Sequence, residues 1–366
     1  MDQQFSYQGQ IWQRLKKNKT AFAGLVIIIF SILVAIFAYV IAPDNTTNAD
    51  LQTVEIQAKK PGYTQLFLKI PDPKTEKNNW FSRLMNGTTS QYRFIPVKSY
   101  TVNNNDLAVE KYIDEDTTVK QVYNVGQLTN NNPGQVNKLF ITKKYWLGTD
   151  AYGRDILSRL IIGTRVSLAV GFIAILISLT LGILLGALAG YFRGWLDELI
   201  MWLVNVTWSI PTLLLVFAIT MALGKGFWQI FIAVGLTMWV SVARLVRGQV
   251  MSIKELEFVQ AAKALGFTNS RIILRHILPN ILGPLMVIAA GNFATAIIIE
   301  AGLSFLGIGV QPPMPSWGLM IKENYNFIIT HNPMLAIIPG LAIMILVLAF
   351  NLLGNGLRDA VDVKEG

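Results

Sequence analysis

The residue types that carry out most enzymatic chemistry are scarce in this sequence. Cysteine is absent and histidine occurs only at His276 and His331, which excludes a thiol nucleophile and a cysteine metal site. The sequence has no GxxxxGK[ST] phosphate loop, no HExxH zinc motif and no GxSxG nucleophile motif. We therefore expect no catalytic, metal-binding or cofactor-binding residue, and the chain is not expected to be an enzyme.

One ionisable side chain, Glu300, lies inside a long apolar run, residues 279–301. A carboxylate within a membrane-spanning segment is costly and is a functional candidate by default, here for the lining of a transport pathway. Because Glu300 lies near the end of its run, the alternative is that it reaches water or pairs with a backbone group. No series of Asp, Glu or His crosses the other apolar runs, which argues against a proton-coupled carrier.

The composition indicates a membrane protein. Hydrophobic residues make up 52 % of the 366 residues and charged residues 14 %, with a mean hydropathy of +0.45, whereas soluble domains carry about 25 % charged residues. We predict an all-α membrane protein with six transmembrane helices of roughly 20 residues each, plus a small β-rich insert. The apolar runs are residues 21–42, 166–192, 199–223, 227–243, 279–301 and 334–353.

The basic residues predict the orientation of these helices. Lys and Arg gather before the first run, at 14–19, and between the fourth and fifth runs, at 244–275. Since short cytoplasmic segments carry an excess of Lys and Arg, both termini are expected in the cytoplasm. The net charge of +9 then reflects basic residues that lie beside a lipid bilayer on its cytoplasmic side, and no nucleic-acid partner is expected.

The long segment at residues 43–145 differs in kind from the apolar runs. Alternating residues at 92–97 and 120–125 predict short strands, and the Asn-rich stretches 103–105 and 130–134 predict turns. We expect a small β-rich domain outside the membrane; a partly disordered insert is the alternative. The chain then divides into residues 1–42 with the first span, this insert, and a membrane domain at 146–366.

Small residues and a proline indicate how the helices pack. Gly182, Gly186 and Gly190 are spaced four apart and therefore lie on one helix face, where another backbone can approach closely. This contact is expected either within the chain or with another subunit. Pro211 is expected to interrupt the third apolar run.

The basic stretch between the fourth and fifth runs predicts a short helix pair at the cytoplasmic face. Ala261 and Ala262 would allow another surface to come close, and Gly266 suits the left-handed residue that ends a helix. Thr268 can cap the next helix and Pro279 suits the start of the following span. The alternative is an amphipathic loop resting on lipid headgroups.

This stretch resembles the EAA motif of ABC importer permeases, in which a coupling helix docks into a cleft of an ATPase subunit. The resemblance implies a coupling helix at about residues 254–278. It departs from the motif at Gln260, where Glu is usual, and at His276, where Ile is usual. The matching residues are Gln260, Ala261, Ala262, Gly266, Leu278 and Pro279.

Four further stretches resemble the C-type permease of oligopeptide and dipeptide ABC importers. They are residues 14–25, 146–165, 303–318 and 350–359. Together with the EAA-like stretch, the resemblance covers the chain except the insert, which is longer than is usual in the family. Asn355 replaces a usual Asp and Val363 replaces a usual Pro.

The resemblance implies a permease half in the bacterial inner membrane, paired with a homologous second permease. Two ABC ATPase subunits would bind ATP and Mg²⁺, and an extracytoplasmic binding protein would deliver an oligopeptide or dipeptide. Nickel and glutathione importers share this permease type and remain alternatives, as do, from other classes, a self-contained channel or carrier and a membrane receptor. The residues implied for an outer gate or for docking the binding protein, with structural packing as the alternative, are Asp150, Arg154, Asp155, Arg159 and Trp317.

Overall fold

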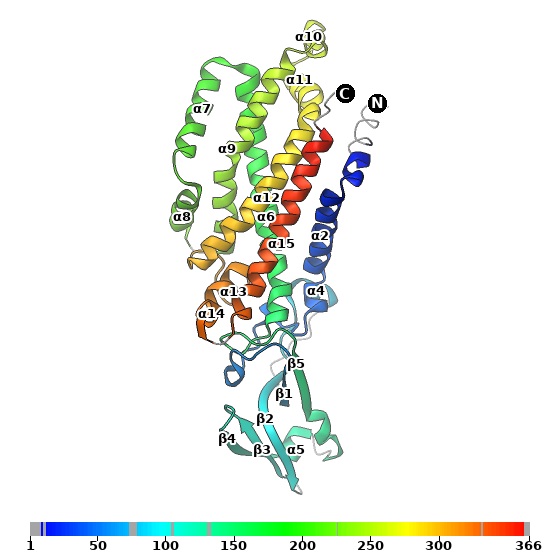
Figure 1. Cartoon of the computed structure of the whole chain (residues 1–366), viewed down its shortest axis with the longest axis vertical. Coiled ribbons are helices and arrows are strands. Elements are labelled where there is room, and N and C mark those ends of the chain that lie inside the picture. The colour runs from blue at the N-terminus through cyan, green and yellow to red at the C-terminus, as the bar shows by residue number, and fades with distance from the viewer. Residues whose placement is uncertain are drawn as a thin grey trace. The chain divides into compact units, whose positions relative to one another are not determined.

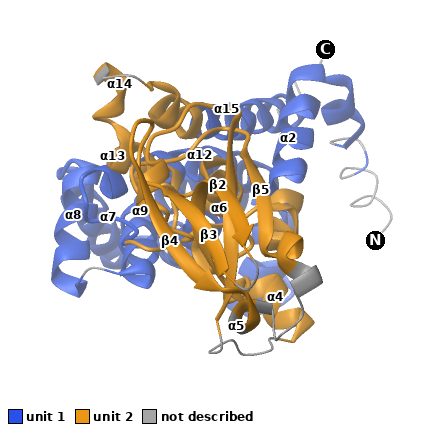
Figure 2. Cartoon of the chain, turned by 90° about the horizontal axis from the view of Figure 1, so that it is seen from below, with its two compact units in different colours: residues 1–32, 167–311, 341–366 blue, residues 33–166, 312–340 orange. Residues whose placement is uncertain are grey.

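The computed structural model describes residues 9, 12–72, 79–103, 106–129, 133–224, 226–330 and 332–361 (Figure 1). These residues form two compact units, one from residues 1–32, 167–311 and 341–366, the other from 33–166 and 312–340 (Figure 2). Parts of the two predicted Asn-rich turns, together with His331 and Val363, lie outside the described residues.

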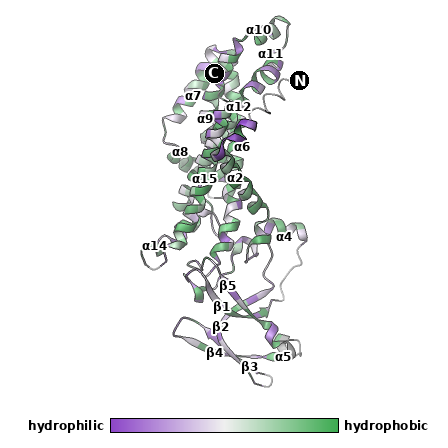
Figure 3. Cartoon of the chain, turned by 45° about the vertical axis from the view of Figure 1, so that its right-hand side comes forward, coloured by the Kyte–Doolittle hydropathy of each residue, from purple (hydrophilic) through white to green (hydrophobic). Residues whose placement is uncertain are grey.

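In the part of the chain that the structure describes, five helical stretches are long and apolar enough to cross a membrane. They are α2 (Lys19–Ile36), α6 (Ile156–Phe192), α9 (Phe227–Lys254), the stretch Asn269–Phe305 that ends in α12 (Leu282–Phe305), and α15 (Met334–Val361). Even the shortest, with 18 residues, is about 27 Å long at 1.5 Å per residue, close to the hydrocarbon thickness of a bilayer. Most of their ribbon is hydrophobic in Figure 3.

The predicted third run is broken into two helices. α7 (Gly194–Trp208) and α8 (Thr212–Leu223) meet at an angle of 94°. Pro211 is the N-cap residue of α8, where its missing N–H and fixed φ interrupt the helical ladder, as expected. The chain has six spans only if this bent pair is counted as one.

The glycine strip of α6 packs against α9, within the chain. A Cβ atom on Gly186 would lie 2.5 Å from the carbonyl oxygen of Ala243, and one on Gly190 would lie 2.6 Å from that of Arg247. Gly182 lies against Val242 in the same way. Of the two contacts considered for this strip, the structure therefore shows the one within the chain.

The segment after α2 forms an antiparallel five-stranded sheet in the order β4-β3-β2-β1-β5. The strands are β1 (Tyr63–Pro71), β2 (Tyr92–Asn103), β3 (Asp106–Tyr112), β4 (Thr118–Asn124) and β5 (Phe140–Tyr145). The prediction of a β-rich segment is confirmed, and its two predicted strands correspond to β2 and β4.

Alternation along the strands gives the sheet an apolar core on each face. On one face, α5 (Val125–Thr129) and the 3-10 segment η3 (Pro133–Leu139) cover the strands. That face buries Leu68, Ile95, Val97, Leu107, Val109, Val125 and Val136. The other face buries Ile56, Phe67, Tyr112 and Tyr145.

Short helices complete both units. The unit with the sheet contains α3 (Ala38–Ile41), α4 (Trp80–Asn86), α13 (Trp317–Asn324), α14 (Phe327–Thr330) and the short 3-10 turns η1 (Thr47–Ala49) and η2 (Val54–Ile56). The other unit contains α10 (Glu257–Ala264), α11 (Asn269–Ile272), the π-helical turn η4 (Ile273–Ile277) and the 3-10 turn η5 (Leu278–Ile281).

Candidate functional sites

The EAA-like stretch forms a short helix, α10, between the membrane helices α9 and α12. Val259 and Ala262 are buried in a cluster with residues of both of these helices, such as Val250 and Leu285. Of the two alanines in the motif, only Ala261 is exposed. With Phe258 and Leu265, which are 44 % and 75 % exposed, Ala261 forms an apolar face at spacings of three and four residues.

Gly266 ends α10 as predicted, with φ at +79°. The N–H of Phe267 donates to the carbonyl of Ala262 at 3.2 Å, and the N–H of Gly266 donates to that of Lys263 at 3.0 Å. This pair of bonds is a Schellman motif, which requires a left-handed residue. Thr268 is the N-cap residue of α11, although its hydroxyl makes no capping hydrogen bond among the described residues.

The segment from α11 to α12 is helical but irregular. Pro279, which lacks an N–H, lies in the first turn of η5 and leads into α12, as expected for the start of a span. Leu278 packs against the buried cluster of α10. His276 stacks on Phe267, with ring centroids 5.9 Å apart, so it packs on the turn after α10.

Polar bonds tie α10 and α11 to neighbouring helices. Gln260 donates through Nε2 to the carbonyl of Lys254 at 2.9 Å, and Lys254 donates through Nζ to the carbonyl of Tyr191 at 2.6 Å. The Tyr191 hydroxyl donates to Oδ1 of Asn269 at 2.8 Å. These bonds connect α10 to α9, α9 to α6, and α6 to α11.

The polar residues singled out at 150–159 form a buried ion cluster in the other unit. Arg154 bonds Asp150 through Nε at 2.6 Å, Glu323 through Nη2 at 2.7 Å and Asp50 through Nη1 at 3.2 Å. Arg159 bonds the same Glu323 through Nη2 at 3.1 Å. The cluster joins the loop before α6 to α13 and to the segment before the sheet.

The cluster is electrostatically well matched around Arg154. Burial alone would lower the pKa of Arg154, but the charges of Asp150 and Glu323 outweigh burial and raise that pKa above its usual value. Nη1 of the fully buried Arg159 has no hydrogen-bond partner among the described residues. Charges held this firmly suit the positioning of a loop better than proton transfer.

Asp155 caps the start of α6. Its carboxylate accepts hydrogen bonds from the backbone N–H of Ser158, at 2.9 Å, and from the Ser158 hydroxyl. Burial raises the pKa of Asp155, and the bonds from Ser158 oppose this rise.

Trp317, at the start of α13, packs beside α6. Its Nε1 donates to the carbonyl of Leu160 at 3.1 Å. A Cβ atom on Gly163 would lie 3.0 Å from the indole ring, so the glycine makes room for it.

Glu300 is fully buried near the end of α12. Its Oε1 accepts a hydrogen bond from the Ser304 hydroxyl at 2.7 Å, and that hydroxyl in turn accepts from the N–H of Val310 at 3.0 Å. The carboxylate therefore helps to fold the loop that follows α12. Contact with a transported molecule stays a prediction.

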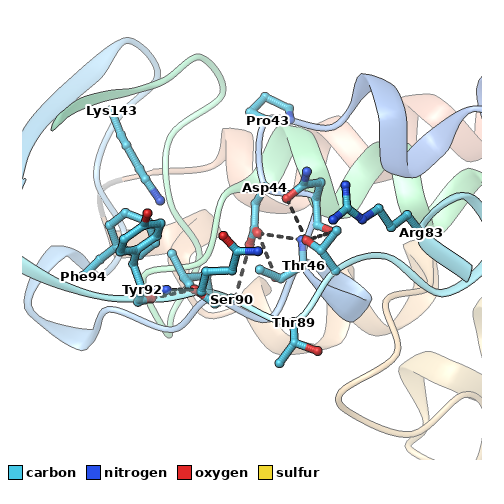
Figure 4. Close-up of a pocket in the computed structure, with 13 residues that line it drawn as sticks. Pro43, Asp44, Thr46, Arg83, Thr89, Ser90, Tyr92, Phe94 and Lys143 are labelled. Carbon is cyan, nitrogen blue, oxygen red and sulfur yellow. Dashed lines mark hydrogen bonds between the residues drawn. The ribbon is translucent and has the colours of Figure 1, made fainter. Parts of the chain in front are cut away.

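A polar pocket of about 380 Å³ lies between the sheet and the segment after α3 (Figure 4). Lys143 lies 3.4 Å from the ring centroid of Phe94 and makes no ion pair among the described residues. Burial lowers the pKa of Lys143, and the charge of Asp44 opposes this. Arg83 lies at the other side of the pocket in this view. The carboxylate of Asp44 also lines the pocket, between these two cations in this view.

The comparisons with known proteins identify the family. The family model for binding-protein-dependent transport system inner membrane components matches residues 182–364. This chain belongs to that family. The model for the N-terminal transmembrane domain of oligopeptide transport permease C matches residues 6–61 of this permease.

Relatives of this permease match about 60 % of its length. It is 44 % identical over 220 residues to the glutathione transport system permease protein GsiD of Pectobacterium atrosepticum. The matched residues make up 60 % of this chain and 73 % of that protein. It is 45 % identical over 221 residues to the dipeptide transport system permease protein DppC of Alkalihalophilus pseudofirmus, and this match covers 60 % of this chain and 72 % of the relative. It is 40 % identical over 223 residues to the oligopeptide transport system permease protein OppC of Bacillus subtilis, and this match covers 61 % of this chain and 73 % of the relative.

Among solved structures, a chain of the inward-facing MetNI methionine ABC transporter matches with a TM-score of 0.47 and 20 % identity, over 56 % of this chain and 97 % of that chain. The family assignment makes this chain the permease subunit of a binding-protein-dependent ABC importer, with several spans in the inner membrane.

Several residues of these sites were not found from the sequence. Asp50 and Glu323 complete the ion cluster but lie 104 and 169 positions from Arg154. Lys143 and Arg83 are brought to one pocket by the sheet and α4. No local motif marks any of these four residues. The apolar face of α10 could have been found from the spacing of Phe258, Ala261 and Leu265.

Proposed function

We propose that this chain forms one half of the pore of an ATP-driven peptide importer and that α10 couples this pore to an ATPase subunit. The observation that carries the proposal is the exposed apolar face of α10, formed by Phe258, Ala261 and Leu265, on a helix whose opposite side is packed into the membrane domain. An apolar face on a short helix between spans suits docking into a groove.

In this mechanism α10 is a lever. Its exposed face contacts the ATPase, while Val259 and Ala262 pass its displacement to α9 and α12. Gly266 permits the turn that returns the chain to the next span. ATP changes the access of the pore only if the ATPase contacts α10 differently in two states, because a ligand shifts an equilibrium only through differential affinity.

The remaining parts follow from the same proposal. The bent pair α7 and α8 counts as one span, giving six spans with both termini and α10 in the cytoplasm. A homologous second permease completes the pore, two ATPases bind ATP and Mg²⁺, and a binding protein delivers the substrate. The division into residues 1–42, 43–145 and 146–366 separates the first span, the outer segment and the membrane domain.

The outer gate is proposed at the loop before α6 and at α13. Asp150, Arg154 and Arg159 hold the loop through the buried ion cluster, and Asp155 caps the helix that follows it. Trp317 packs beside this helix. These residues act by fixing the shape of the binding-protein docking surface. Glu300 is proposed to lie along the pathway.

Peptides are the proposed substrates. The relatives named above are permeases for glutathione, dipeptides and oligopeptides, and all three substrates contain amide-linked amino acids with charged ends. Uptake of a radiolabelled dipeptide into proteoliposomes that hold the complete transporter, ATP and binding protein tests this substrate class. Uptake that needs ATP and this chain is expected. A complex that hydrolyses ATP but accumulates none of a series of di-, tri- and tetrapeptides would contradict it.

The role of α10 is tested by purifying the tagged chain from its native membrane in mild detergent and identifying co-purified proteins by mass spectrometry. Leu265→Glu places a carboxylate in the proposed interface, so recovery of ATPase subunits should fall about tenfold or more. Val122→Glu is the matched control, because Val122 is 66 % exposed on β4. Full recovery of ATPases with Leu265→Glu would contradict docking through this face.

A further inference from the structure

Helix α4 (Trp80–Asn86), which no function described above uses, exposes large apolar side chains. Trp80 is 74 % exposed, Phe81 is 65 % exposed and Met85, one turn after Phe81, is 44 % exposed. Two adjacent aromatic residues with a methionine on one short helix form a contiguous apolar patch. Patches of this kind mark contact with another molecule or with a membrane.

The end of α4 is fixed to the end of the first membrane span. α4 contacts α3 (Ala38–Ile41), which follows α2 after one residue. Gly87 ends α4 with φ at +77° and lies against the ring of Tyr39, where a Cβ atom would be 2.8 Å from Cε1. A larger residue at this position would push α4 away from α3.

A second membrane helix holds the same end of α4. Arg165 of α6 donates through Nη1 to the carbonyl oxygens of Met85, at 2.8 Å, and Leu84, at 3.3 Å. These are carbonyls of the last turn, which have no partner within the helix and favour a cation. Arg165 also lies 5.7 Å from the ring of Tyr39, so one cluster joins α3, α4 and α6.

The residues of this cluster lie near the ends of the first two apolar runs of the sequence, 21–42 and 166–192. Val40 and Ile41, which are 68 % and 52 % exposed, continue the apolar surface of the first span into α3. Arg165 directly precedes the apolar run at 166–192. Tyr and Arg at the ends of spans are typical of the boundary between membrane and water. The C-terminal end of α4 therefore lies against α3, the short apolar helix that follows the first span.

We propose that α4 lies in the membrane–water interface, with Trp80, Phe81 and Met85 among the lipid headgroups and upper acyl chains. Trp favours this region because its ring is apolar and its N–H can bond headgroups. The exposed polar residues of the helix, Arg83 and Asn86, suit headgroup phosphates and water. The partner of this surface is the lipid bilayer, and the proposal holds for either orientation of the chain.

The absence of cysteine makes a direct depth measurement possible. Phe81→Cys would carry a nitroxide spin label in the full chain within lipid nanodiscs. Its collision rates with oxygen, which concentrates in lipid, and with a water-soluble nickel chelate would be measured by power saturation. Val122→Cys, at an equally exposed site on β4, is the matched control. Met85→Cys gives a second position on the patch.

The proposal predicts that oxygen collisions exceed nickel collisions at Phe81→Cys and Met85→Cys, and that the ratio is reversed at Val122→Cys. A label at Phe81→Cys that is as accessible to nickel as the control would place α4 in water and overturn the proposal. Low accessibility to both reagents would show that protein covers the patch, and this result would also overturn it.

Discussion

Arg154 shows how strongly the loop before α6 depends on one side chain. Its side chain is 2 % exposed and bonds three carboxylates, of which that of Asp150 is buried and that of Glu323 is 9 % exposed. Replacing one partner of a buried ion pair leaves the other charges in a medium that solvates them poorly. Loss of Arg154 should therefore destabilise the folded chain.

Arg154→Met should lower the free energy of unfolding by about 3–5 kcal/mol, because three carboxylates lose the charge of Arg154 and Arg159 alone then faces Asp150 and Glu323. Chemical denaturation of the purified chain in mild detergent measures this change. Arg83→Met is the matched control: Arg83 is exposed and makes no side-chain hydrogen bond or ion pair among the described residues, so a change within about 0.5 kcal/mol is expected. Equal effects of the two substitutions would show that the ion cluster contributes nothing to stability.

At the scale of helices, the packing of α6 against α9 depends on the absence of side chains. The three glycines let the backbones approach so closely that a Cβ atom would lie within 3 Å of α9. Not every glycine in these two helices packs closely against a neighbouring helix. Gly248 lies in the partner helix α9, but a Cβ atom there would meet no atom within 4 Å.

Gly186→Ala should destabilise the chain by about 1–3 kcal/mol, because the new methyl group would overlap the carbonyl of Ala243. Gly248→Ala should instead stabilise it by up to about 1 kcal/mol, since alanine is the better helix former. Thermal unfolding in detergent compares the two variants. If Gly186→Ala unfolds at the same temperature as Gly248→Ala, the close approach of α6 and α9 does not hold in solution.

Across the whole molecule, the features predicted correctly from the sequence are those that depend on residues close together in the chain. The apolar runs predicted the long helices, and Gly266 and Pro211 predicted a helix end and a bend, because each acts through its own backbone. Contacts between distant segments left no such signal. The pairing of Arg154 with Glu323 spans 169 positions and forms only when α13 packs beside the loop before α6.

The sheet was predicted only in part for the same reason. Alternation marked β2 and β4, whereas β1, β3 and the edge strand β5 were not recognised, although the pairing of β5 with β1 is regular. The exposed patch on α4 was missed because a seven-residue helix has too few residues for a clear period. Burial of Ala262 and exposure of Ala261 also required the packed structure, since the two are adjacent in the sequence.

The measurement that tests the central claim most directly is cross-linking from α10 to an ATPase in the complete transporter. Ala261→Cys, on the exposed face of α10, would carry a photoactivated maleimide cross-linker, with Val122→Cys on β4 as the control. We predict an adduct between the Ala261→Cys chain and an ATPase subunit that is absent from the control. If a complex that still imports peptide gives no ATPase adduct from Ala261→Cys, α10 is not the coupling helix.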